Sequence, residues 1–302
     1  MSDESHKKHL WKRLRLEIQG VVQGVGFRPF VYSAAIKFDL KGFVGNESKG
    51  VFIEVEGNTA TLSDFQNYLN VNKPPLAHIT TIKTEEIASQ FSDIFYIAES
   101  ENQANENTLV SPDVSVCKDC LRELFNKKDR RFRYPFINCT NCGTRFTIIK
   151  DIPYDRSKTT MSVFEMCELC RKEYENPSSR RFHAQPNACA ECGPKVWFVG
   201  KIDEKVFGEE AISATRKALA NGEVVAVKGI GGFHLACDAR NDTTLRKLRE
   251  RKGRIDKPFA VMCKDLETAQ KFVEISDAER NLLMSKEQSV VLCSSKDFAR
   301  HR

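Results

Sequence analysis

Eight of the eleven cysteines occur in four Cys-x-x-Cys pairs, and this spacing is the strongest chemical signal in the chain. Both halves of the set read Cys-x₂-Cys-x₁₈-Cys-x₂-Cys, and they align without a gap at an offset of 50 residues. Framework residues repeat with them, because Arg130-Arg131-Phe132 recurs as Arg180-Arg181-Phe182. Since four thiolates complete a tetrahedral Zn²⁺ site, the pattern predicts a duplicated zinc-finger module, 117–192, with units 117–142 and 167–192. The predicted ligands are Cys117, Cys120, Cys139, Cys142, Cys167, Cys170, Cys189 and Cys192.

Pairing within each half is the simplest assignment of ligands, because each repeat unit then closes on itself. Pairing between the halves uses the same number of ligands and stays open. Four thiolates leave no coordination position for a substrate, so both Zn²⁺ ions are expected to be structural. Redox pairs are the alternative, although a redox pair would not normally recur four times in register. Units this short lack a core of their own, so the metal should supply much of their folding energy.

A second chemical feature is the glycine-rich segment at residues 20–30, Gly-Val-Val-Gln-Gly-Val-Gly-Phe-Arg-Pro-Phe. Glycines allow successive backbone N–H groups to point inward and bind an anion. Pro29 suits the start of a helix, whose N-terminus adds partial positive charge. Arg28 offers a planar guanidinium for phosphate oxygens, and Asn46, after the next strand-like run, can hold a water for attack. A plain glycine-rich turn with a surface arginine is the alternative.

The longer pattern resembles the acylphosphatase family, at residues 22–28 and again at residues 42–46. The resemblance implies that Arg28 binds the phosphate and that Asn46 orients the hydrolytic water. It also implies a phosphate cradle formed by Gln23, Gly24, Val25, Gly26 and Phe27.

A third segment, residues 228–262, is a candidate nucleotide site. Residues 246–257 contain seven basic and two acidic side chains, a composition that is also common on a solvated helix face. The segment resembles the YrdC-like domain, which binds ATP and makes carbamoyl adenylates. That resemblance implies nucleotide contacts from Lys252, Arg254 and Lys257, and less specifically from Lys228.

Three regions must position these residues. Residues 10–98 alternate strand-like and helix-like stretches in the order βαββαβ, with one short extra strand, which predicts a ferredoxin-like acylphosphatase domain. Residues 99–116 are polar and aperiodic, as in a linker. After the zinc module, residues 201–302 regain α/β texture, with a helix over 209–220 and a buried strand over 224–227. The expected fold class is therefore α+β multidomain.

Composition excludes several classes of protein. The net charge of +6 invites a nucleic-acid interpretation, but two dications held by eight thiolates would remove most of that excess. No nucleic-acid recognition motif is present, so nucleic acid is not expected as a partner. No apolar run is long enough to cross a membrane, and the start lacks the pattern of a secretory signal. Paired cysteines without such a signal indicate a reducing compartment, so a cytoplasmic protein is expected.

In this order the three parts resemble the N-terminal part of the HypF family, the carbamoyltransferases of [NiFe]-hydrogenase maturation. The resemblance implies that the first domain hydrolyses carbamoyl phosphate and that the YrdC-like domain adenylates the carbamate with ATP. A C-terminal domain then transfers the carbamoyl group to a cysteine of a HypE-like acceptor. Too few residues follow the zinc module for a whole YrdC-like domain, so we expect a truncated chain that retains acyl-phosphate hydrolysis. The alternative is a zinc-dependent protein- or nucleic-acid-binding module with a vestigial cradle.

Overall fold

The structure is a computed structural model that describes residues 11–47, 49–99, 109–200, 204–253 and 257–296. The chain divides into two units, Met1–Pro194 and Lys195–Arg302. The first unit contains both the glycine-rich segment and all eight paired cysteines. The second contains the candidate nucleotide segment.

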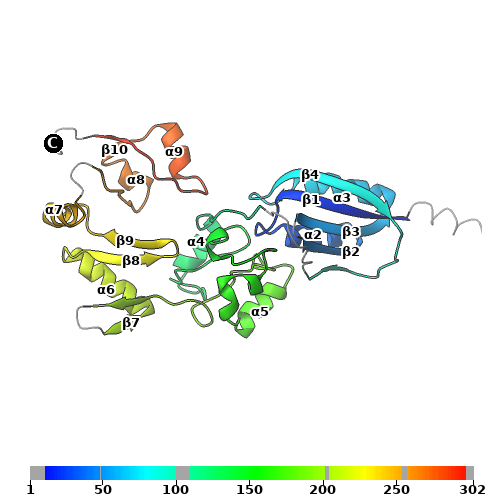
Figure 1. Ribbon diagram of the computed structural model, residues 1–302, viewed down its shortest axis with the longest axis horizontal. Helices are drawn as coiled ribbons and strands as arrows, with labels where there is room; N and C mark the ends of the chain where they lie inside the picture. Colours follow the sequence, from blue (N-terminus) through cyan, green and yellow to red (C-terminus); the bar gives the residue numbers. More distant parts are fainter. Residues whose placement is uncertain (1–10, 48, 100–108, 201–203, 254–256, 297–302) are drawn as a thin grey trace, which may run out of the picture. The chain divides into compact units, whose positions relative to one another are not determined.

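The first unit begins with a five-stranded sheet that carries two helices on one face (Figure 1). The strand order is β4-β1-β3-β2-β5, and neighbours are antiparallel except β2 and β5, which are parallel. This arrangement confirms the predicted ferredoxin-like order with a short extra strand. Its elements are β1 (Trp11–Val21), α2 (Phe27–Lys37), β2 (Lys41–Glu47), β3 (Gly50–Asn58), α3 (Thr59–Val71), β4 (His78–Ile87) and β5 (Phe95–Ile97).

The core of this domain lies between the sheet and the two helices. Strand β1 alternates buried Leu16 and Ile18 with more exposed residues, and α2 buries Val31, Ala34 and Ala35 at helical spacing. Helix α3 starts where the Asn58 side chain accepts a hydrogen bond from the Ala60 amide, at 3.0 Å. It ends before Pro74-Pro75, which cannot continue a helix. The packed sheet therefore fixes where β1 ends and α2 begins, which is where the glycine-rich segment lies.

The zinc-finger region consists of short elements arranged twice. Helices α4 (Lys118–Phe125) and α5 (Glu168–Glu175) each begin directly after the first cysteine of a half. Cys117 is the N-cap of α4, and its sulfur accepts a hydrogen bond from the Cys120 amide. Between the halves the chain forms three 3₁₀ turns, η1 (Phe146–Ile148), η2 (Arg156–Lys158) and η3 (Thr160–Val163). Both helices are only eight residues long, so their stability depends on the surrounding Cys-x-x-Cys turns rather than on helix propensity.

The predicted linker is only partly described, because residues 100–108 lie outside the described residues. Its C-terminal part contacts both neighbouring parts of the first unit. Val110 pairs with Gln23 beside the glycine-rich segment, and Val114 pairs with Gly143 in the zinc-finger region. This part of the segment is therefore bound to the fold by backbone pairing.

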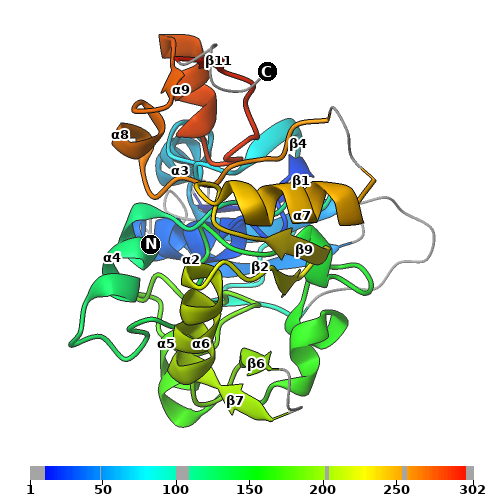
Figure 2. The ribbon, with the colours of Figure 1, turned by 90° about the vertical axis from the view of Figure 1, so that its left-hand side faces the viewer.

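The described part of the second unit contains three two-stranded sheets, β6–β7, β8–β9 and β10–β11, and helix α6 packs on the β6–β7 hairpin (Figure 2). The predicted helix over 209–220 is confirmed as α6, but the expectation of a buried strand over 224–227 is wrong. In β8 the side chains of Ala226, Val227 and Lys228 are exposed, because among the described residues β8 pairs with β9 alone. The elements are β6 (Trp197–Val199), β7 (Lys205–Phe207), α6 (Gly208–Ala220), β8 (Val225–Gly229), β9 (Gly232–Ala236), α7 (Asp242–Arg251), α8 (Leu266–Ala269), β10 (Val273–Glu274), α9 (Asp277–Leu283) and β11 (Ser294–Ser295).

Candidate acyl-phosphate site and metal centres

The glycine-rich segment forms a sharp turn between β1 and α2. Gly24 and Gly26 have φ values of 72° and 75°, in the left-handed region that glycine enters without steric cost. Gly26 is the N-cap of α2, and no described side chain caps this end of the helix. The first backbone hydrogen bond at this end runs from the Phe30 N–H to the Gly26 carbonyl at 3.1 Å, and the helix dipole favours an anion there.

Arg28 and Asn46 both line one cavity at this turn, together with Gln23, Gly24, Gly26 and Phe27. Arg28 is the second residue of α2 and is 8% exposed, whereas Asn46 lies near the end of β2 and is 1% exposed. Neither Nδ2 nor Oδ1 of Asn46 has a hydrogen-bond partner among the described residues. A buried amide without partners is costly, so its polar atoms indicate a place for water or a ligand. The enclosed part of the cavity, about 20 Å³, holds about one water molecule, and the cavity opens to solvent beyond it.

Gln23, predicted as part of the cradle, also fixes the turn through its side chain. Its Nε2 donates to the carbonyl oxygens of Glu47 and Gly50, both at 2.8 Å. Its Oε1 accepts a hydrogen bond from the Tyr154 amide at 2.9 Å. Val25, the other predicted cradle residue, has a side chain that is fully buried in the domain core, so only its backbone is suited to bind an anion.

The zinc-finger region closes this cavity from the other side, which the sequence did not predict. Arg28 Nη2 donates to Asp155 Oδ1 at 2.8 Å, and the Arg145 guanidinium donates to the Gly24 carbonyl. Arg145 also donates to carbonyl oxygens next to the first cysteine quartet, including that of Cys139 at 2.8 Å. Asp155 and Arg145 lie between the two repeats, where no spacing or repetition marks them. The fold of the zinc-finger region therefore determines how Arg28 is oriented.

His183, from the second repeat, lines the same cavity. Its backbone is left-handed, with φ of 51°, and its ring lies against those of Phe182 and Tyr174 at centroid distances of 4.6 and 5.0 Å. Burial, and then the nearby charge of Arg28, lower the pKa of His183 to about 4. The imidazole is therefore uncharged at neutral pH. No motif in the sequence marked this histidine.

The eight paired cysteines form two clusters, each drawn from one repeat. Within each cluster one sulfur atom from every cysteine lies within 4.8 Å of the others. The resolved neighbouring Sγ–Sγ separations run from 3.6 Å, for Cys170 and Cys192, to 3.8 Å, for Cys139 and Cys142. A tetrahedron with Zn–S bonds of about 2.3 Å has edges of about 3.8 Å, so these quartets have the size of a Zn²⁺ site. None of the eight is in a disulfide.

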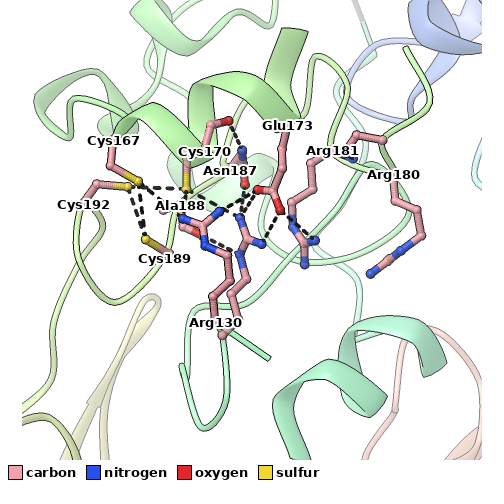
Figure 3. Close-up of polar contacts among 12 residues, drawn as sticks. Arg130, Cys167, Cys170, Glu173, Arg180, Arg181, Asn187, Ala188, Cys189 and Cys192 are labelled. Atoms are coloured by element: carbon pink, nitrogen blue, oxygen red, sulfur yellow. Dashed lines mark hydrogen bonds and ion pairs between the residues drawn. The ribbon is translucent and has the colours of Figure 1, made fainter. Parts of the chain in front are cut away.

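Each cysteine quartet is bordered by arginines from the opposite repeat. Arg130 Nη2 lies 3.4 Å from Cys167 Sγ and 3.2 Å from Cys170 Sγ, and its Nη1 lies 3.1 Å from Glu173 (Figure 3). Arg131, which is 1% exposed, donates to Glu173 at 2.9 Å and lies 3.5 Å from Cys170 Sγ. Burial alone would raise the pKa of Glu173, but the hydrogen bond from Arg131 and the charges of the nearby arginines lower it.

Arginines of the second repeat make the equivalent contacts with the cysteines and carboxylates of the first repeat. Arg180 Nη1 lies 3.6 Å from Cys120 Sγ, and both Arg180 and Arg181 pair with Glu123 at 2.5 Å. Arg181 Nε donates to the Asn138 carbonyl, the counterpart of the bond from Arg131 to Ala188 at the 50-residue offset. The sequence showed that these arginines repeat, but not that they are exchanged between repeats. All four are engaged with carboxylates and sulfur atoms, which disfavours them as contacts for nucleic-acid phosphates.

The candidate nucleotide residues are not assembled into a site by any contact among the described residues. Lys228 lies on β8 with its Nζ 5.1 Å from the ring centre of Phe233, and Lys252 is the C-cap of α7. Lys257 is exposed, and Arg254 lies outside the described residues. Helix α7 buries only Thr244 and Leu248, as expected for the solvated face that the sequence left as an alternative.

Three family models match the chain in the order of its parts. The acylphosphatase model matches residues 14–97, the HypF finger model matches 116–149 and 166–199, and the telomere recombination model, that of Sua5, YciO and YrdC, matches 217–300. No described helix is long and apolar enough to cross a membrane.

Several known proteins are similar to the chain, over most of its length or over its first domain. It is 49% identical to carbamoyltransferase HypF2 of Cupriavidus necator, over 93% of this chain and 35% of that protein. It is also 49% identical to a probable carbamoyltransferase HypF of Methanocaldococcus jannaschii, over 96% and 38%. A full-length HypF solved in a phosphate- and nucleotide-bound form matches with a TM-score of 0.86 at 48% identity, covering 91% of this chain and 36% of that one. The acylphosphatase of Thermotoga petrophila is 38% identical over 28% of this chain and 96% of its own length.

Proposed function

Because this chain belongs to the HypF family of carbamoyltransferases, of whose members it spans just over a third of the length, we propose that its acylphosphatase domain hydrolyses carbamoyl phosphate. The products are carbamate and inorganic phosphate. The observation that carries the proposal is the buried Asn46 amide, which has no partner among the described residues and lines the same cavity as Arg28.

The phosphoryl group would occupy the turn at the start of α2. Backbone N–H groups of residues 24–28, together with the Arg28 guanidinium, would surround its oxygens and stabilise the charge on them in the transition state. Asp155 holds one side of the Arg28 guanidinium, so the remaining N–H groups keep a defined direction. The protein supplies position and charge rather than a covalent intermediate.

Asn46 would orient the attacking water. Its Oδ1 can accept a hydrogen bond from the water while its Nδ2 donates to an oxygen of the phosphoryl group. The water oxygen attacks phosphorus, the bond from phosphorus to the acyl oxygen breaks, and carbamate leaves with the electron pair. The water protons remain on the inorganic phosphate, so neither a protein base nor a metal enters the balance.

We assign the two cysteine quartets to two structural Zn²⁺ ions. The Sγ–Sγ separations match a tetrahedral thiolate site, and the exchanged arginines offset the negative charge of four thiolates on a dication. Zn²⁺ would then stabilise the Cys-x-x-Cys turns, and with them the positions of Arg145, Asp155 and His183 against the cradle.

The later steps of the family reaction are proposed for the whole protein rather than for this segment. In that proposal ATP adenylates the carbamate in the YrdC-like domain, with Lys228, Lys252, Arg254 and Lys257 as nucleotide contacts, and a HypE-like protein accepts the carbamoyl group. The support is the match of residues 217–300 to the telomere recombination model and the likeness to HypF proteins.

The test is phosphate release from carbamoyl phosphate by the purified chain and two variants, Arg28→Ala and Asn46→Ala. Each substitution should lower kcat/KM by about 10²–10³-fold, the usual effect of losing a transition-state hydrogen bond. Asn70→Ala, on the exposed side of α3, is the matched control and should keep the activity of the unmodified chain. Zinc content and thermal unfolding check the fold of each variant. Equal rates in the Arg28 and Asn46 variants and in the control would contradict the assignment.

A further inference from the structure

The two zinc repeats agree at the cysteines and the paired arginines but differ at every position of residues 133–138 and their counterparts, residues 183–188. Residues 133–135 read Arg-Tyr-Pro, whereas residues 183–185, at the 50-residue offset, read His-Ala-Gln. The backbone is the same in both, because Arg133 and His183 have left-handed φ values of 57° and 51°. The difference therefore lies in what the side chains contact.

Only the second triplet lines the cavity that contains Arg28 and Asn46; residues 133–135 of the first repeat form no part of its lining. Tyr134 packs instead in the core of the zinc-finger region, with its hydroxyl 3.4 Å from the Pro194 carbonyl. At the equivalent place in the second repeat, the small side chain of Ala184 lines the cavity. One repeat has thus diverged at the positions where it faces the cradle.

The surface formed by residues 183–185 is polar and rigidly held. Gln185 Oε1 accepts hydrogen bonds from the Arg156 amide at 2.7 Å and from the Tyr174 hydroxyl at 3.1 Å, and its Nε2 donates to the His183 carbonyl at 3.0 Å. The His183 ring is fixed between aromatic neighbours and, being uncharged, presents one donor and one acceptor nitrogen. A rigid wall with an acceptor nitrogen can distinguish ligands by size and by whether they carry an N–H group.

We propose that residues 183–185 form the acyl wall of the pocket and restrict it to acyl phosphates whose acyl group is compact and bears an N–H donor. The inference rests on the hydrolysis proposed above and deepens it by defining the substrate class. The cavity is lined by the cradle and by the zinc-finger region, so a phosphoryl group held in the cradle leaves its acyl group against this wall. A carbamoyl group satisfies both conditions, an acetyl group lacks the donor, and a benzoyl group is too large.

The experiment compares kcat/KM for carbamoyl, acetyl and benzoyl phosphate in the full chain and three variants. His183→Asn shortens the side chain while keeping a residue that tolerates positive φ, and Ala184→Val narrows the cavity. Arg133→Ala, at the equivalent position of the first repeat, is the matched control. Two zinc ions per chain confirm that each variant is folded.

In the unmodified chain, carbamoyl phosphate should exceed each of the other substrates by at least about tenfold, the discrimination typical of one group in a pocket. His183→Asn should reduce the ratio of carbamoyl to benzoyl phosphate at least about tenfold, and Ala184→Val should raise it, while Arg133→Ala leaves it unchanged. Hydrolysis with unchanged ratios in both wall variants would overturn the wall but leave the proposed hydrolysis intact. A folded chain that releases no phosphate from any substrate would instead reject the hydrolysis itself. If His183→Asn loses zinc, the ratio of carbamoyl to benzoyl phosphate hydrolysis in Ala184→Val alone decides whether residues 183–185 form the wall.

Discussion

The exchange of arginines between the zinc repeats leads to a prediction in which each substitution weakens the opposite metal site. In Arg131→Ala, Glu173 loses its shortest partner, and the Ala188 carbonyl and the Asn187 side chain lose a donor. Arg131 is almost fully buried, and removing one partner of a buried ion pair typically costs about 3–5 kcal/mol. The affected quartet is the one at residues 167–192, although the arginine belongs to the first repeat.

The assay is zinc release in urea, followed with a chromogenic chelator, with cysteine alkylation mapped by mass spectrometry. With a urea slope of about 1–3 kcal/mol per molar, a loss of about 3 kcal/mol lowers the midpoint of release by at least about 1 M. In Arg131→Ala the cysteines of residues 167–192 should be alkylated first, whereas in Arg181→Ala those of residues 117–142 should react first. Lys172→Ala removes an exposed pair with Glu168 on α5, worth about 0.3–0.5 kcal/mol, and serves as the control.

Two results would refute this reasoning. A midpoint for Arg131→Ala equal to that of Lys172→Ala would mean that the buried guanidinium contributes nothing to the site. Faster alkylation of residues 117–142 in Arg131→Ala would mean that each arginine stabilises its own repeat, so that the contacts between repeats do not govern metal retention.

Three further predictions concern the first unit. Burial would raise the pKa of Glu56, but hydrogen bonds from the backbone of residues 90–92 lower this pKa. The stabilisation from the Glu56 carboxylate is therefore complete above the unfolded pKa of about 4.3 and is lost as the pH falls through the folded pKa. Glu56→Gln should cost about 1–3 kcal/mol of stability at pH 7 and flatten this acid dependence in urea unfolding curves. Gly26→Ala forces alanine into the left-handed region at a cost of about 1–2 kcal/mol and places its Cβ 2.9 Å from the Thr140 Cβ. The rate of phosphate release should therefore fall more than in the control Gly200→Ala, whose Cβ has no contact under 3.6 Å. Removing two Zn²⁺ ions per chain with a chelator should expose the amides of residues 117–192 to hydrogen exchange while β1–β5 stay protected; protection of both would show that the metal does not hold the module.

The dependence of the cradle on its neighbour gives the zinc-finger region a role beyond scaffolding. Arg28 is oriented by Asp155, and the Gly24 carbonyl is held by Arg145, so both the charge and the backbone of the cradle are set from outside the acylphosphatase domain. Loss of Zn²⁺ should therefore weaken phosphate binding even where the β1–β5 sheet stays folded.

Local sequence determined the elements of the first domain and which eight cysteines form the two clusters. Alternation in β1, the helical spacing of Val31, Ala34 and Ala35, and the prolines after α3 are local signals, and each predicted an element within a few residues of its observed bounds. The cysteine clusters were equally predictable from the sequence, because a Zn²⁺ site needs fixed short spacings between its cysteines and the duplication shows these spacings twice.

Burial in the second unit could not be predicted in the same way. The apolar run at residues 224–227 gave a strand, as expected, but its side chains are exposed because burial depends on what packs against a strand and not on its own composition. The nucleotide-site interpretation of residues 246–257 likewise required basic side chains to converge, and no contact among the described residues of this unit brings them together.

By itself, the sequence predicted a phosphate cradle and identified the two cysteine quartets, since the residues of each motif lie a few positions apart. Only the tertiary structure decided that they face each other, that Arg28 meets Asp155 across 127 positions, and that each repeat supplies arginines to the other's thiolates. Contacts across such separations leave no periodicity or spacing in the chain, because they depend on how whole domains pack, and a single sequence records only its local preferences.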